Sequence, residues 1–544
     1  MGNLSSRIKP RKKRLRHPAP LPKNVADSST EGGSDEASKA QDSEPTYEPP
    51  PGYDDFLRVY PRFVESAAVD ELRARDFTRL SQSAVYLDYM GGGQYPESLI
   101  RSHAETLQNN VFGNTHSESM SSQLSEQYSQ DARRTVLSFF DADPNDSLVL
   151  PVDAHNSVQG IRAFAGRAGA SVKYVPCLEE GGPTYKKLWS QILRGLAEPT
   201  NSSGTRPRSL MALTGLSNLT NRKLPLSQIV SAAQAHGIHT ILDAAALAPT
   251  TRISLRNTPV DSMVVSFYKM FGFPTGVGAL IAKKGFLDIL ERPWFAGGAV
   301  DLVQVPGVIA TPAECVSSRF EEGTINYLTL PAVTTGINML SKYIDLLPIR
   351  LSSLYHYLYN QLSMLQYPDT KTPVVQILTR EPSPPSTAPP HGYVLSFLIL
   401  DRKGDIVPLT HIEALAARKG REGLPAVSPA FKSTSKHPRS RTHQSDLPTH
   451  SLPPLAQQSF SDSTTTERII SLRTGCACNP GGAAALLGIE SYMQLLQPGA
   501  TQRSLELVVG RELGVIRVSL GWVSDWSDIA AFVQFVGGIR EIVG

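Results

Sequence analysis

Cysteine is scarce in this chain, and long uncharged apolar runs are missing from it. Four cysteines, Cys177, Cys315, Cys476 and Cys478, are too few among 544 residues for a disulfide framework. No secretory apolar segment precedes the folded part, and no uncharged apolar run approaches the roughly 18 residues that span a bilayer. We therefore expect a protein of a reducing compartment, in the cytoplasm.

A strong excess of charge of either sign is also missing. The chain contains 53 Lys and Arg against 50 Asp and Glu, and its formal net charge is +3. So balanced a charge gives no reason to expect a nucleic-acid partner. Hydrophobic residues make up 40% and charged residues 19% of the chain, which is an ordinary globular composition and excludes a fibrous or largely disordered protein.

Basic residues gather near the N-terminus. Seven of them lie within the first sixteen positions: Arg7, Lys9, Arg11, Lys12, Lys13, Arg14 and Arg16. The preceding segment Met1-Gly2-Asn3-Leu4-Ser5-Ser6 fits the N-myristoylation pattern, and a basic cluster is the second signal that a single acyl chain needs for stable attachment. The hypothesis is a membrane tether through Gly2; a solvated basic tail and an import signal are the alternatives.

Composition also predicts the domain organisation. Residues 1–55, basic and then acidic, are rich in polar residues and proline and are predicted to be disordered. The rest of the chain is long enough for a large domain at residues 80–380 and a smaller C-terminal α+β domain at residues 390–544. Residues 421–467, dense in Ser, Thr, Pro and His, predict a disordered insertion within the smaller domain.

One lysine follows a predicted buried strand. In DSMVVSFYKMFGFPTGVGAL, residues 261–280, an apolar run leads to Lys269, and a glycine-rich turn follows it. Desolvation among apolar neighbours lowers the pKa of a lysine, and a neutral amine forms a Schiff base with an aldehyde such as pyridoxal phosphate. The alternative is a surface lysine after a core strand.

The segment SFYKMFGFPTGVGALI resembles the cofactor-lysine segment of class V (NifS-like) aminotransferases, and is most similar to that of the desulfurase domain of molybdenum cofactor sulfurases. The resemblance covers roughly residues 85–540. It implies an α/β protein of the pyridoxal phosphate-dependent transferase fold type I, with a large, mostly parallel sheet domain and a smaller C-terminal domain. Pyridoxal 5'-phosphate is then the cofactor, and Lys269 is the residue that holds it.

Three further residues acquire cofactor-binding roles from this resemblance. Asp243 follows the predicted strand at 240–243, and a carboxylate there is a suitable partner for a protonated pyridine nitrogen; an N-cap is the alternative. His155, in DAHNSVQGIR, matches the histidine that stacks on the ring. Asn218 matches the asparagine that bonds the phenolic oxygen, although an ordinary turn asparagine is the alternative.

Other motifs resemble the entrance of the site and its dimer contact. Asn114 and His116, in NNVFGNTHS, resemble the entrance segment and imply substrate contacts; they could equally be loop residues that bond the backbone. Thr324, in FEEGT, matches the threonine that reaches the partner's phosphate, which implies a homodimer. Ser266 is the remaining candidate for the phosphate within the same chain, unless it is a core hydroxyl.

A second specific motif lies near the C-terminus. The segment RTGCACNPG, from Arg473, is similar to the sulfurase motif R-T-G-C-F-C-N-P-G. Arg473 offers a bidentate fork for a substrate carboxylate, and Cys478 can attack the substrate's sulfur as a thiolate. Cys476 is a second thiol or a small packing residue. CxC pairs also bind metals, but no other Cys or His pair has zinc spacing, so no metal is expected.

One family feature is missing. In the family a strand, a Gly/Ala/Thr turn that holds the cofactor phosphate, and a helix precede the stacking histidine. Here only Asp141 to Asp153 separate Phe140 from Ala154, and this stretch contains no Thr- or Gly-rich turn. Losing two or three charge-assisted hydrogen bonds would weaken cofactor binding by about 10² to 10⁶-fold. Such a deletion would also leave a gap in the sheet.

These motifs together predict a cysteine desulfurase. L-Cysteine or a related amino acid would be the substrate, Cys478 would take up its sulfur as a persulfide, and alanine would be released. One alternative is another C–S lyase or a class V transaminase of a specialised pathway. The other, motivated by the missing turn, is a pseudoenzyme that binds no pyridoxal phosphate.

Overall fold

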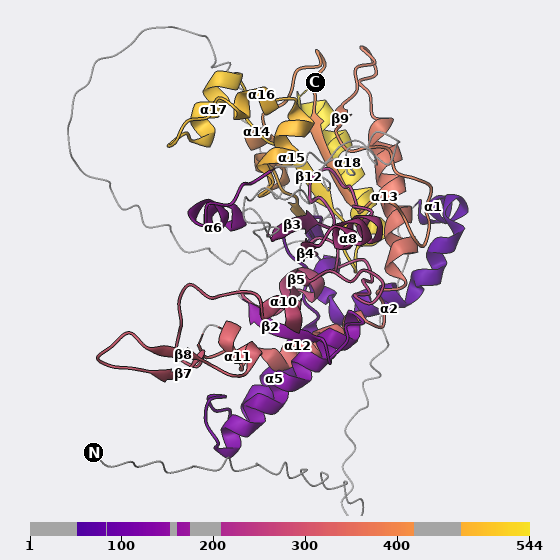
Figure 1. Cartoon of the computed structure of the whole chain (residues 1–544). Helices are drawn as coiled ribbons and strands as arrows, with labels where there is room; N and C mark the ends of the chain where they lie inside the picture. Colours follow the sequence, from indigo (N-terminus) through magenta and orange to yellow (C-terminus); the bar gives the residue numbers. More distant parts are fainter. Residues whose placement is uncertain are drawn as a thin grey trace, which may run out of the picture. The chain divides into compact units, whose positions relative to one another are not determined.

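The structure is a computed structural model that describes residues 52–82, 84–152, 160–173, 208–321, 323–417 and 469–543 (Figure 1). Several predictions fall elsewhere: Gly2 and the basic cluster, His155, and the disordered insertion at 421–467 all lie outside the described residues.

A five-stranded sheet carries the candidate lysine. Its strands are β2 (Ser147–Val152), β3 (Ser209–Thr214), β4 (Ile238–Asp243), β5 (Ser262–Ser266) and β6 (Gly278–Lys283), in the spatial order β2-β6-β5-β4-β3. Strands β3, β4 and β5 pair in parallel, and β6 runs antiparallel to both β5 and β2. Four of the five strands therefore point the same way. Asp243 and Ser266 end their strands at the same edge, where open α/β sheets bind ligands.

Among the described residues, five helices contact this sheet: α5 (Met120–Phe139), α8 (Leu226–Ala235), α9 (Phe267–Phe271), α10 (Lys284–Leu287) and α11 (Val316–Phe320). Helix α12 (Leu330–Leu340) packs on α5 and α9, and α4 (Glu97–Asn109) packs on α12. Helix α6 (Ile161–Arg167) has no buried residue. The side chain of Ser119 caps α5 by accepting a hydrogen bond from the Ser122 amide. Helix α5 packs against α12 and β2 (Figure 1). Buried Ser125 and Ser129 share one side of α5, and such small side chains permit close helix packing.

A second sheet is formed by the C-terminal part of the chain. Strands β9 (Val375–Ile377), β10 (Val394–Ile399) and β12 (Ile516–Ser519) are antiparallel in the order β12-β10-β9. All six residues of β10 are buried, as expected for a central strand. The helices of this part are α13 (Leu347–Ser363), α14 (Leu409–Ala416), α15 (Pro480–Leu487), α16 (Glu490–Met493), α17 (Gln502–Val509) and α18 (Trp526–Val543).

Four N-terminal helical segments pack on this second part. They are α1 (Tyr53–Val59), the 3₁₀-helix η1 (Pro61–Ser66), α2 (Ala67–Asp76) and α3 (Thr78–Gln82). Tyr53 to Asp55, assigned to the tail from sequence, form the start of α1. Phe56 and Phe63 are almost fully buried, and Arg73 of α2 pairs with Asp525 and Asp528 beside α18. Buried aromatic area and this ion cluster hold the segments in place.

Two smaller strand pairs complete the fold. Strand β1 (Ala84–Tyr86) pairs in parallel with β11 (Ile469–Ser471), which joins the beginning of the folded chain to its last part. Strands β7 (Val300–Val303) and β8 (Ala310–Pro312) form an antiparallel hairpin.

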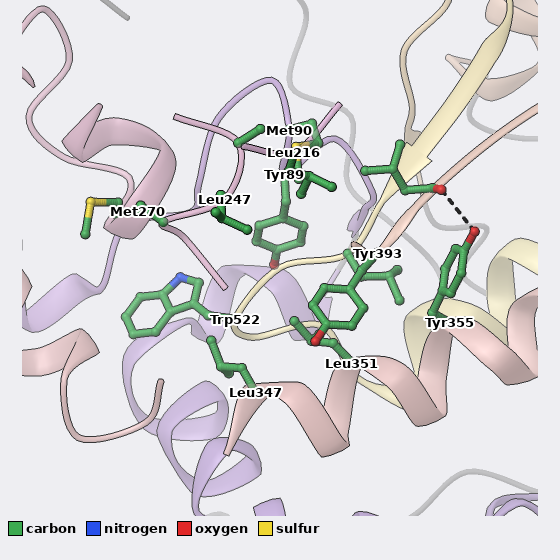
Figure 2. Packing of buried hydrophobic residues seen from close by; sticks show 14 of the residues in the cluster. Tyr89, Met90, Leu216, Leu247, Met270, Leu347, Leu351, Tyr355, Tyr393 and Trp522 are labelled. Atoms are coloured by element: carbon green, nitrogen blue, oxygen red, sulfur yellow. Dashed lines mark hydrogen bonds between the residues drawn. The ribbon is translucent and has the colours of Figure 1, made fainter. Parts of the chain in front are cut away.

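Side chains from distant segments share one core. Figure 2 shows Tyr89, Leu216, Met270 and Trp522 packed together with residues of α13, and all four are at most 5% exposed. Tyr355 of α13 donates a hydrogen bond to the Val394 carbonyl of β10 at 3.1 Å, the dashed line in Figure 2. The loops that carry the candidate site therefore rest on a continuous apolar core.

Local sequence patterns predict several of these elements. Residues 119–140 and 225–235 predict helices, which are α5 and α8, and the strand predicted at 393–400 is β10. A strand predicted at 172–175 is wrong for Val172 and Lys173, which are not in a strand. The five strands pair without a break, but residues 153–159 and 174–207, between β2 and β3 in the chain, lie outside the described residues, so the expected gap in the sheet stays a prediction. Within the described ranges, no helix has the length and apolar character needed to cross a membrane.

Candidate active site

Lys269 lies in the short helix α9, directly after strand β5. It is only 8% exposed, and its pKa is lowered to about 8, chiefly by desolvation. The charges of Arg517 and Arg473 contribute to this lowering, whereas Asp243 and Asp88 act in the opposite direction. A larger fraction of this amine is therefore neutral near pH 7 than for an exposed lysine.

The backbone around Lys269 is held tightly by the loop that follows β1. Gly93 donates a hydrogen bond from its amide to the Tyr268 carbonyl at 2.8 Å. Gly272 ends α9 with a φ of 82°, and an added Cβ there would meet the Tyr95 amide nitrogen at 2.3 Å. Only glycine fits at this position, because both the left-handed conformation and the close approach exclude a side chain.

Asp243 ends β4, next to β5. Its Oδ1 accepts a hydrogen bond from the Ala245 amide at 3.0 Å. Burial raises the pKa of Asp243, while that hydrogen bond and the charge of Lys269 lower it. Among the described residues, only Ala245 donates a hydrogen bond to this carboxyl group, so one oxygen remains available to a further donor.

Two arginines and one aspartate lie beside the lysine. Arg473 and Arg517 exchange backbone hydrogen bonds at 3.1 and 2.7 Å. Both side chains reach Asp88: Arg517 bonds its Oδ1, and Arg473 Nη1 lies 3.7 Å from its Oδ2. Arg517 is 2% exposed, desolvation lowers its pKa, and its Nε has no hydrogen-bond partner among the described residues. A donor thus remains for an anionic ligand.

The cysteine motif forms a tight turn at the same place. The Asn479 amide donates to the Cys476 carbonyl at 2.8 Å, and Ala477 and Cys478 have φ values of 45° and 59°. Two consecutive residues with positive φ indicate a type I′ turn. Asn218 holds this turn, because its Nδ2 donates to the Ala477 carbonyl at 2.7 Å and its Oδ1 accepts from Asn479 at 3.0 Å.

Electrostatic interactions connect the turn to the lysine. Burial raises the pKa of Tyr268, the residue before Lys269; Arg473 lowers it, and the charge of Cys478 raises it further. Cys478 also acts on the pKa of Arg517, which in turn acts on Lys269. The structure therefore brings together Lys269, Asp243, Asn218, Arg473 and Cys478, which we call the lysine site.

The predicted entrance residues form a separate group. Asn114 donates from Nδ2 to Thr324 Oγ1 at 3.2 Å, and its Oδ1 accepts the His116 amide at 3.0 Å. The ring of His116 lies so close to Gly298 that an added Cβ would be 2.5 Å away. These contacts join Asn114, His116 and Thr324 to one another, and none of the contacts described for Lys269 reaches them. Ser266 is 1% exposed, and its Oγ has no partner among the described residues.

Two charged residues of the site, Asp88 and Arg517, lie in no motif that predicted a functional role. Arg517 is a charged residue inside strand β12, all of whose residues are buried, and a buried charge needs a partner. That signal indicated a functional or paired arginine, but nothing in the sequence indicated Asp88 as the partner.

Known proteins resemble this chain in sequence. Residues 143–377 match the family model described as aminotransferase class-V. The molybdenum cofactor sulfurase of Bos taurus is 28% identical over 89% of this chain and 54% of its own length; that of Neurospora crassa is 30% identical over 86% and 48%. The chain thus spans about half the length of the curated relatives it matches.

Solved structures share the fold. The cysteine desulfurase CsdA from Escherichia coli superposes with a TM-score of 0.59 at 18% identity, covering 88% of this chain and 99% of that one. A cysteine desulfurase from Thermococcus onnurineus NA1 gives 0.58 at 16% identity, covering 87% and 98%. The fold is that of the pyridoxal phosphate-dependent transferases of fold type I. Within that fold, residues 143–377 of the chain are similar to the aminotransferase class-V family.

The pKa of Lys269 leads to a test of the site. Reaction of Lys269 with an aldehyde should become about tenfold faster for each pH unit up to about pH 8, and then level off, because only the neutral amine reacts. Pyridoxal phosphate, trapped on the protein by borohydride at a series of pH values, gives the rate for the Lys269 peptide by mass spectrometry. A rate that keeps rising towards the pKa of an exposed lysine, about 10.4, would contradict the burial argument.

Proposed function

We propose that this chain is a pyridoxal phosphate-dependent cysteine desulfurase of the molybdenum cofactor sulfurase type. In this proposal it takes sulfur from L-cysteine as a persulfide on Cys478 and releases alanine. The observation that carries the proposal is the meeting of a buried lysine and an exposed thiol at one pair of arginines. The sulfur acceptor is not part of the proposal.

Residues of the lysine site, together with Ser266 at the end of β5, fit the cofactor. The Lys269 amine is buried with a lowered pKa, Asp243 has a carboxyl oxygen available for a pyridine nitrogen, and the unpartnered hydroxyl of buried Ser266 suits a phosphate oxygen. When bound, pyridoxal phosphate supplies an electron sink for bond cleavage next to the amino group. A solved fold neighbour is described with glycine covalently linked to its pyridoxal phosphate cofactor.

The charges of the site fit an amino-acid substrate. Arg473 is partly exposed and Arg517 is buried, so one guanidinium lies near the surface of the site and the other in its interior. Both can donate hydrogen bonds to the α-carboxylate of one substrate molecule. Asp88 compensates part of their charge and fixes their side chains. Lys269, with its pKa of about 8, is able to take up and return a proton near neutral pH.

Cys478 supplies the nucleophile in this proposal. Its thiol is exposed on the turn and interacts electrostatically with the buried guanidinium of Arg517. The thiolate sulfur bonds to the sulfur of the bound cysteine while the Cβ–S bond breaks. Protons then complete the remaining three-carbon amino acid as alanine.

Assembly and location are also proposals. Apolar side chains are exposed on and around the hairpin β7–β8, including Leu302, Val305, Val308 and Ile309, at 57% to 98%. Such a surface suits burial against a second copy, in agreement with a homodimer in which Thr324 serves the partner's site. A membrane tether through Gly2 and the basic cluster, in the cytoplasm, remains a proposal from the sequence.

A single cysteine substitution tests the proposal. Cys478→Ser should lower alanine release from cysteine at least about 100-fold, because no nucleophile remains to accept the sulfur. Persulfide on the protein, detected by alkylation and mass spectrometry, should disappear with it. If alanine forms undiminished, sulfur does not pass through Cys478; if pyruvate and sulfide form instead, the chain is a C–S lyase.

Cys315→Ser is the matched control. Cys315 is also exposed, and its Sγ lies 3.1 Å from Ser317 Oγ. Burial acts to raise its pKa, but hydrogen bonds from Ser317 and Ser318 outweigh this and lower it. A favoured thiolate outside the lysine site makes Cys315 a stringent control, and its loss should leave alanine release unchanged.

A further inference from the structure

The turn of the lysine site carries two thiols. Cys476 and Cys478 are both exposed and free, and they flank Ala477, which is 7% exposed. The desulfurase proposal uses only Cys478. The structure therefore presents a second nucleophile next to the proposed persulfide, with no role yet assigned to it.

The geometry of the turn allows the two sulfurs to meet. Even a fully extended chain separates Cα atoms two residues apart by at most about 7 Å, and a turn shortens this separation. The hydrogen bond from Asn479 to Cys476 closes the turn, with Cys476 at its first and Cys478 at its third position. Disulfides form across Cα separations of about 4.4 to 6.8 Å, so the turn places both cysteines within bonding range.

Contacts on both sides keep the turn in this shape. Asn218, after β3, binds the Ala477 carbonyl and the Asn479 side chain. Asn479 Oδ1 also caps α15 by accepting from the Gly482 amide at 2.8 Å. The backbone between the two cysteines is therefore fixed, while both of their side chains remain exposed.

We propose that Cys476 is a resolving thiol that discharges a persulfide on Cys478; this inference rests on the proposed desulfurase function. The Cys476 thiol loses its proton to water, and its sulfur attacks Cys478 Sγ. A Cys476–Cys478 disulfide forms, the bond to the outer sulfur breaks, and that sulfur leaves with the electron pair as hydrosulfide. Cys476 is oxidised and the outer sulfur is reduced, so no other oxidant is needed.

The step gives the protein a resting state when no acceptor takes the sulfur. The disulfide removes the nucleophile and stops further turnover at that site. A small-molecule thiol restores both cysteines by exchange, because the bond is exposed. Sulfur release as hydrosulfide and transfer to an acceptor thus become competing fates of one persulfide.

The test loads the 544-residue chain with sulfur in two ways, without acceptor or added reductant. One sample receives a single equivalent of cysteine with pyridoxal phosphate, so that no excess thiol remains to reduce a disulfide; the other receives inorganic polysulfide, which makes persulfides without the lysine. Alkylation and mass spectrometry then follow the peptide with both cysteines. In the wild type we expect a Cys476–Cys478 disulfide with one hydrosulfide released for each. In Cys476→Ser the persulfide should persist on Cys478, with hydrosulfide release at least tenfold lower.

The variants separate the two proposals. Lys269→Ala charged with polysulfide should still form the disulfide; if it does so while cysteine charges neither protein, the resolving role holds and the desulfurase function fails. Cys315→Ser should behave as the wild type. A wild-type protein that keeps its persulfide on Cys478, with Cys476 alkylated as a free thiol, overturns the inference.

Discussion

Lys269→Ala is expected to abolish the covalent retention of pyridoxal phosphate and to lower alanine release from cysteine by at least about 10² to 10⁴-fold, the range attributed to a positioned proton-transfer group. The physical reason is that this amine is buried, has a pKa of about 8 and lies beside Asp243. Absorption of the cofactor on the purified protein and borohydride labelling of the Lys269 peptide measure the effect.

Lys223→Ala is the matched control. Burial lowers the pKa of Lys223 to about 8 as well, but its Nζ donates to the Pro389 carbonyl at 3.3 Å and lies near the Tyr393 ring. Lys223 has about the same pKa as Lys269, so its amine should be equally reactive. It lies outside the lysine site, so its loss should leave cofactor retention unchanged. Labelling of Lys223 in place of Lys269 would contradict the site. A wild type that binds no cofactor, with Lys269→Ala indistinguishable from it, would establish a pseudoenzyme.

Arg73→Ala is expected to lower the free energy of unfolding by about 3 to 5 kcal/mol. Arg73 Nη1 and Nη2 donate to the carboxylate of Asp528 at 2.7 and 2.9 Å, and its Nε lies 3.1 Å from Asp525 Oδ2. All three residues are at most 5% exposed. The substitution leaves two carboxylates buried without a cation. Urea unfolding of the variant and the wild type measures the resulting loss in the free energy of unfolding.

The pH dependence identifies the cause of this loss. Without Arg73 the pKa values of both carboxyl groups should rise in the folded state, so the destabilisation is full at high pH and shrinks as protonation removes the unpaired charges. The matched control is Arg62→Ala, which removes an exposed pair with Glu65 and should have no measurable effect. Equal effects of the two substitutions, or a loss that does not depend on pH, would contradict the ion-cluster argument.

The lysine site was predictable where a single stretch of chain carries the signal. Lys269 and Asp243 each follow a short apolar strand, and the carboxyl ends of parallel strands meet at one sheet edge. Cys478 and Arg473 lie in one short motif. Asp88 was not predictable, because its partner Arg517 lies 429 positions away and only the folded chain brings them together.

The N-terminal helices and the order of strands in the sheet were not predictable either, because both depend on contacts between segments that are far apart in the sequence. Helices α1 and η1 form around Phe56 and Phe63, which bury themselves against the distant helix α13, and a local pattern does not reveal such a surface. The sequence predicted neither strand β2, which lies between Phe140 and Ala154, nor which strand would lie beside it. Strand pairing depends on which edge is free, and one strand's own residues do not specify it.

The parallel pair of β1 and β11 has a consequence for biosynthesis. Ala84 pairs with Ile469, so about 385 residues must be made after the first strand before its partner exists, which takes about 20 to 80 seconds at ribosomal rates. Throughout that interval the backbone groups of 84–86 have no ladder partner. The nascent chain therefore exposes an unpaired strand edge while it is still on the ribosome, and such an edge can pair with other chains. We expect the yield of folded protein to depend more on chaperones that cover this segment than on the stability of the finished fold.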